Sequence, residues 1–123
     1  MTAVRRWVLA MLLAAGTAAA IPGVTAAARA EDPAEARYVH YRKVIHAAER
    51  CRLDFPFGSP EQSRMAGYID AKVDHAISAG RRLMLIEKAK SDVNKLVDKH
   101  GCGHDVADLL AVYDKELAPL LKP

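Results

Sequence analysis

The chain has 123 residues, with 18 basic residues, 15 acidic residues and a formal net charge of +3. The whole surplus comes from Arg5, Arg6 and Arg29, so residues 31–123 are electrically neutral. Proteins that bind nucleic acid or acidic lipid need an excess of lysine and arginine, and the lack of one here argues against both functions.

The first 30 residues have the three parts of a secretory signal peptide. Two arginines form a basic start, an apolar run follows over residues 7–21, and small residues end at Ala28-Arg29-Ala30, which matches a cleavage site. A membrane anchor is the alternative, but Gly16 and Pro22 interrupt the apolar part, whereas a spanning helix needs roughly 20 consecutive apolar residues. We therefore expect cleavage after residue 30 and a periplasmic or secreted protein without a stable membrane anchor.

A single domain is expected over residues 31–123, and its first helix is expected to begin near Pro33. Asp32 can cap this helix, proline fits its first position, and Glu35 can reach back to the amide of the cap. Apolar residues then recur at steps of three and four, which places them on one buried face. These residues are Tyr41, Val44, Ala48, Cys51 and Phe55.

A second helical region follows a segment rich in proline and glycine, and Ser59 is its predicted cap. From there an apolar stripe keeps helical phase as far as His100. One unbroken helix over residues 60–99 would be about 60 Å long, too long for a domain of this size, so a break or kink is expected at Ser78-Ala79-Gly80. The stripe consists of Met65, Ile69, Val73, Ala76, Gly80, Leu83, Ile86, Ala89, Val93, Leu96, Val97 and His100.

The long helical region is expected to stop at Gly101, because glycine suits the left-handed position that closes a helix. Asp105 then caps a final helix that ends at Pro119. The buried stripe of this helix is Val106, Leu109, Leu110, Tyr113 and Leu117. No segment shows the period-two alternation of a strand, so the predicted fold class is all-α, a small bundle of three to four helices.

Cys51 and Cys102 are the only cysteines, and we expect them to form a disulfide. An exported protein reaches an oxidising compartment, where an even number of cysteines is normally paired. The bond would tie the end of the first helix to the connection before the last one. Closing a loop of this size predicts a stabilisation of roughly 4 kcal/mol.

The segment HGCGHD, residues 100–105, offers a metal site as the alternative to the disulfide. Histidine and cysteine both bind transition metals. A cysteine in a disulfide provides no thiolate, however, and two histidines alone do not complete such a site. We therefore expect no cofactor and no metal, with His100 and His104 as weak candidates only.

No catalytic motif identifies an enzyme, because the nucleophile, metalloprotease, haem and phosphate-loop signatures are all absent from the sequence. Asp70 and Asp74 are one helical turn apart, but they lie off the apolar stripe and are expected on a solvated surface. His40 and His46 lie off the stripe of the first helix and have no visible partner.

Phe55 and Phe57 flank Pro56 after the first helix and are the only phenylalanines of the chain. Burial of both rings under the loop is one interpretation, because aromatic residues dominate small cores. The other is an exposed pair that contacts a partner or an apolar ligand. On the second interpretation, Phe55, Pro56 and Phe57 form the candidate partner-contact loop.

These features predict a small exported protein that binds rather than catalyses, as a periplasmic binding, inhibitor-like or chaperone-like module. Its partner is expected to be another periplasmic protein or a small ligand, and not nucleic acid. Two alternatives stay open. One is a histidine-based metal-binding protein, and the other is a small enzyme whose cleft would contain His75 or His100 beside a carboxylate.

Overall fold

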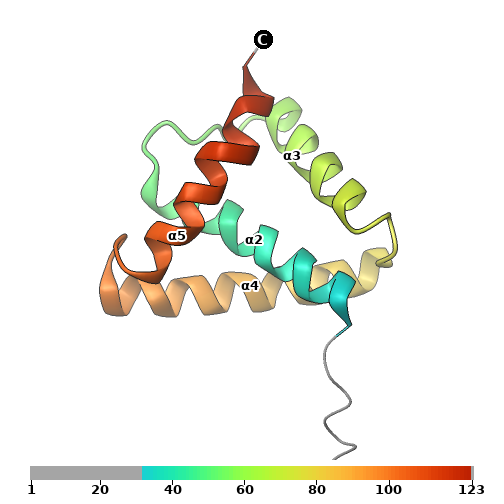
Figure 1. Ribbon diagram of the computed structural model, residues 1–123, viewed down its shortest axis with the longest axis horizontal. Helices are drawn as coiled ribbons and strands as arrows, with labels where there is room; N and C mark the ends of the chain where they lie inside the picture. The colour runs from blue at the N-terminus through green and yellow to red at the C-terminus, as the bar shows by residue number, and fades with distance from the viewer. Residues whose placement is uncertain (1–31, 123) are drawn as a thin grey trace, which may run out of the picture. The chain divides into compact units, whose positions relative to one another are not determined.

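The computed structural model describes residues 32–122, which fold into helices joined by short connections (Figure 1). Among these residues there is no strand, so the predicted all-α class is confirmed, and no helix is long and apolar enough to cross a membrane. The predicted signal peptide lies outside the described residues. The elements are α2 (Pro33–Cys51), α3 (Ser59–Lys72), α4 (Ala79–His100), α5 (Asp105–Val112), the π-helical turn η1 (Tyr113–Leu117) and the 3-10 turn η2 (Ala118–Leu121).

Helix α2 is the central element, because α3, α4, α5 and η1 all pack against it. Figure 1 shows α2 crossing α4, while α5 rises from the C-terminal end of α4 and leads the chain toward the start of α3. The last turn, η2, then packs against α3. The C-terminal segment therefore connects the pair formed by α2 and α4 with α3.

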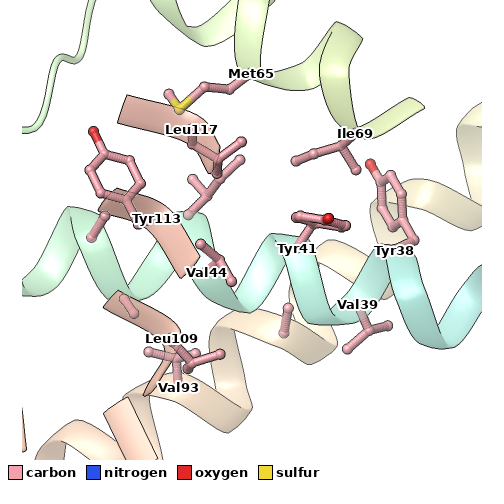
Figure 2. Packing of buried hydrophobic residues seen from close by; sticks show 14 of the residues in the cluster. Tyr38, Val39, Tyr41, Val44, Met65, Ile69, Val93, Leu109, Tyr113 and Leu117 are labelled. Carbon is pink, nitrogen blue, oxygen red and sulfur yellow. The ribbon is translucent and has the colours of Figure 1, made fainter. Parts of the chain in front are cut away.

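The core lies where the faces of these helices meet (Figure 2). The predicted residues Tyr41, Val44 and Ala48 of α2 are buried there. The buried face of α2 is wider than predicted, because this helix packs on several sides at once, and a single stripe cannot serve them all. The additional buried residues are Tyr38, Val39, Ile45 and Ala47.

The two middle helices are separate, as expected, but the break lies before Gly80. Helix α3 ends at Lys72, and α4 begins after Ser78, whose hydroxyl caps the new helix. In the connection, Asp74 and His75 have positive φ angles of 53° and 54°, a left-handed conformation that interrupts a right-handed helix. Gly80 itself lies within the first turn of α4.

The stripe predicted for α4 is correct along most of the helix, because Ile86, Leu96 and Val97 also pack against the core, and it is wrong near the two ends. Leu83 is 66% exposed and His100 is exposed, whereas Leu85 is buried. Ala89 and Val93 are buried as predicted.

Two of the predicted caps lie one residue too late. Gly58, not Ser59, is the N-cap of α3, and His104, not Asp105, is the N-cap of α5. The last helix is also not a regular α-helix up to Pro119. It changes to π-helical geometry in η1 and then to 3-10 geometry in η2. The end of α4 is as predicted, with Gly101 at a φ of 71°.

Candidate functional site

The predicted disulfide between Cys51 and Cys102 is present. It joins the last residue of α2 to the connection between α4 and α5 across a sequence separation of 51 residues. The 52–58 loop begins directly after Cys51, and the connection over residues 101–104 contains Cys102. One covalent bond therefore fixes the starting point of two exposed loops at the same place on the surface.

In the 52–58 loop, Phe55 is buried and Phe57 is exposed. The two rings are therefore neither both buried under the loop nor both exposed as a contact pair. Phe55 is 4% exposed and its ring lies 5.9 Å from that of Tyr113 in the core, measured between centroids. Phe57 is 71% exposed, and its ring meets that of Phe55 edge to face at 5.0 Å. Phe55 therefore anchors the loop, and Phe57 extends from that anchor toward solvent.

Leu53 is the second large apolar side chain that this loop exposes, and it is fully accessible to solvent. Sequence patterns did not single it out, because one leucine after a helix end has no periodicity that marks it. Its two neighbours, Arg52 and Asp54, are charged. The loop thus presents Leu53 and Phe57 among polar residues, as a small contact surface does.

The loop is held by contacts at both ends. The guanidinium of Arg52 donates two hydrogen bonds to the carboxylate of Asp114, at 3.2 Å and 2.5 Å. The side-chain amide of Gln62 on α3 donates to the carbonyl of Pro56 at 3.1 Å. A two-pronged arginine–carboxylate pair fixes orientation as well as distance, so the exposed side chains are held on an ordered support.

A cavity of about 320 Å³ adjoins this loop, and we call it the loop cavity. A volume of this size can take one large side chain or a small ligand. The lining residues carry three carboxylates and two cationic groups, which leaves one excess negative charge. They are Arg52, Asp54, Pro56, Glu61, Tyr113, Asp114, Ala118, Leu121 and Lys122.

The hydroxyl of Tyr113 is the least satisfied polar group in the lining. Tyr113 is 4% exposed, and no hydrogen-bond partner for its hydroxyl is found within residues 32–122. Figure 2 shows this hydroxyl at the edge of the core, pointing away from Val44 and Val93. Burial, followed by the carboxylates of Asp54 and Asp114, raises its pKa, so the hydroxyl stays protonated and able to donate. A buried donor without a partner calls for a water molecule or a ligand atom.

A cleft with His75 or His100 beside a carboxylate would favour the enzyme alternative, and neither residue lines the loop cavity or the second cavity. A second cavity of about 170 Å³ instead contains His46. Contrary to the sequence interpretation, His46 has partners: Nδ1 lies 2.6 Å from Oε1 of Glu49, and Nε2 lies 3.0 Å from Oδ1 of Asn94. Both ring nitrogens of His46 therefore contact side chains of the protein itself.

Asp70 and Asp74, which are four residues apart in the sequence, do not form a carboxylate pair. Asp70 accepts from Arg82 of α4 at 3.4 Å, while Asp74 lies beyond the end of α3 in a left-handed conformation. Asp70 therefore links the two helices that flank the break. This is a structural role, consistent with the expected partly solvated surface.

His100 and His104 are brought together by the connection between α4 and α5. Their ring centroids are 4.9 Å apart, and both residues are exposed. No group of three or more histidine, cysteine or acidic side chains is close enough to hold a metal ion within the described part of the chain.

Comparisons with protein-family models, with curated proteins and with solved structures found no match to this chain.

A cluster of one glutamate and two tyrosines joins α2, α3 and η1. The sequence pattern did not predict it. One carboxylate oxygen of Glu116 accepts hydrogen bonds from the hydroxyls of Tyr41, at 2.7 Å, and Tyr68, at 2.8 Å. These two bonds lower the pKa of Glu116. Burial, followed by the bond to Glu116, raises the pKa of Tyr41. The cluster therefore consists of an ionised acceptor and a neutral donor on each side, which is a stabilising arrangement.

We expect Glu116→Gln to lower the free energy of unfolding by about 1–2 kcal/mol at neutral pH, because the amide loses the negative charge that strengthens both bonds. The fold lowers the pKa of Glu116 from 4.5, so the contribution of the carboxylate is complete above that pH and disappears as the pH falls through the folded-state value. Urea unfolding at several pH values should show the difference between the two proteins shrinking on acidification. A difference that is independent of pH would contradict this role.

Proposed function

We propose that this protein is an exported binding protein without catalytic activity, which contacts a partner protein through Leu53 and Phe57 of the 52–58 loop. The observation that carries the proposal is the full or near-full exposure of two large apolar side chains on a loop that is anchored at both ends. An exposed apolar side chain on a rigid support loses little conformational entropy on binding. Residues of this kind are the usual centres of protein interfaces.

The loop cavity supports a more specific form of the proposal, in which one side chain of the partner enters beside Phe57. Pro56 and Leu121 provide apolar wall, and the hydroxyl of Tyr113 offers an unused hydrogen-bond donor. Because the lining has one excess negative charge, a lysine or arginine side chain fits it better than an acidic one. The partner segment would thus combine a cationic residue with an apolar one that covers Leu53.

Export is supported by the disulfide, since such bonds persist mainly in oxidising compartments, and by the signal-peptide pattern of residues 1–30. The role of an inhibitor-like or chaperone-like module in the periplasm follows from this location and from the contact surface.

A photo-crosslinking residue in place of Leu53 is expected to capture one defined partner in cells that export the chain. Leu83 provides the matched control, because it is also a largely exposed leucine but lies on α4, away from the loop. Adding Phe57→Ala to the Leu53 probe should reduce the crosslink by about tenfold or more, which corresponds to loss of a central aromatic contact. Immunoblotting and mass spectrometry measure the product and identify the partner.

The melting temperature of the Phe57→Ala protein should stay within about 2 °C of the unchanged protein, because an exposed ring contributes little to folding. Equal crosslinking from positions 53 and 83, or a crosslink that survives the loss of the Phe57 ring, would refute the proposed contact surface. A cationic residue in the captured segment would support the assignment of the loop cavity.

A further inference from the structure

The rings of His100, at the end of α4, and His104, at the start of α5, lie close together. The His100 and His104 rings have centroids 4.9 Å apart and planes inclined by 51°. Both residues are exposed, so an ion from solvent can reach them. The sequence spacing alone could not establish this proximity, because two glycines in the connection allow many conformations.

The spacing of the rings can be compared with coordination geometry. A metal–nitrogen bond of about 2.0 Å places the centre of an imidazole ring about 3.2 Å from the metal. Two such rings would have centroids about 4.5 Å apart at a 90° angle and about 5.2 Å apart at a tetrahedral angle. The observed 4.9 Å lies between these values. The separation of the rings is therefore the one that two imidazoles on a single ion would have.

The backbone holds this arrangement without help from an ion. Gly101 ends α4 with a φ of 71°, and His104 caps α5 with a φ of 50°. Between them, Cys102 is bonded to Cys51 of α2. The disulfide restrains the connection, so less ordering is required when the second histidine joins the first on an ion.

We propose that His100 and His104 form a two-histidine site for a divalent transition-metal ion, with Cu²⁺ bound most tightly and water in the remaining positions. Imidazole is a good ligand for copper, nickel and zinc, and the general affinity order places Cu²⁺ first. Cys102 takes no part, because its sulfur is in the disulfide. Neither histidine lines the loop cavity.

Isothermal titration of CuCl₂ into the full-length chain, with the disulfide intact, tests the proposal. We expect one Cu²⁺ per chain, with NiCl₂ and ZnCl₂ binding more weakly. His100→Gln and His104→Gln should each weaken Cu²⁺ binding by about a hundredfold, because a single imidazole lacks the benefit of a second, tethered ligand. His40→Gln is the matched control: His40 is also exposed, but it lies on α2 and has no second histidine beside it, so its loss should leave the affinity unchanged.

Electron paramagnetic resonance of the copper-loaded chain provides a second measurement, with coupling to two nitrogen atoms expected in the unchanged protein and to fewer in either variant. Circular dichroism should show equal helicity for all four proteins, since the replaced side chains are exposed. Binding that survives replacement of either His100 or His104, or that is equally weakened in the His40 control, would show that the pair is only a surface contact between rings.

Discussion

The melting temperature is expected to fall by ten degrees or more when Cys51 or Cys102 is replaced by serine. Loss of a native disulfide from a small domain costs about 2–5 kcal/mol, and each kcal/mol corresponds to about 4–8 °C at this size. The effect is large here because the bond closes a loop of 51 residues and links α2, the central helix, to the connection before α5. Without it, the unfolded chain gains conformations that the bond excludes.

Two controls separate loss of the bond from damage caused by the new side chain. The double replacement should melt at the same temperature as either single one, since each removes the same bond. The unchanged protein treated with a reductant should melt near the serine variants. Thiol titration of the denatured, unreduced protein should find no free cysteine, and two free thiols per chain would refute the prediction.

Leu117→Ala is expected to destabilise the domain by about 2–5 kcal/mol, the range for removing a leucine side chain from a tightly packed core. Leu117 has no exposed surface and ends η1, where the chain lies against α2 (Figure 2). The π-helical turn and the 3-10 turn that follows it limit how far this segment can move to fill the space that the lost side chain leaves. Urea unfolding followed by circular dichroism measures the change.

Leu53→Ala is the matched control, because it removes the same atoms from a fully exposed position. We expect that change to alter the free energy of unfolding by about 0.5 kcal/mol or less. Comparable losses from the two substitutions would mean that Leu117 is not part of the packed core. The same control protein also serves the partner experiment, since Leu53 is assigned to the contact surface and not to stability.

The helices could be predicted where local chemistry decides them. Helix α2 begins at Pro33 as predicted, and α4 ends at Gly101 as predicted, because the residues that begin and end a helix act over a few neighbours. The burial of the first turns of α4 could not be predicted, because it depends on which other elements pack against them. Leu83 was therefore expected to be buried, and Leu85 was missed.

The candidate site could be predicted in part. The segment Phe55-Pro56-Phe57 was identified from its aromatic residues, but its two rings could not be distinguished by composition. Their exposure depends on Tyr113, which comes from a segment far along the chain and packs against Phe55. Leu53 and the loop cavity could not be predicted for the same reason, since their surroundings come from several elements.

The sequence by itself determined the all-helical class and the identity of the disulfide. Helical periodicity is a local property, and two cysteines allow only one pairing. Only the tertiary structure decided that Phe57 is exposed, that His46 contacts Asn94, and that a single carboxylate on η1 receives two tyrosine hydroxyls. These features depend on contacts between residues far apart in the chain, and such contacts exist only once the helices have packed at defined angles against α2.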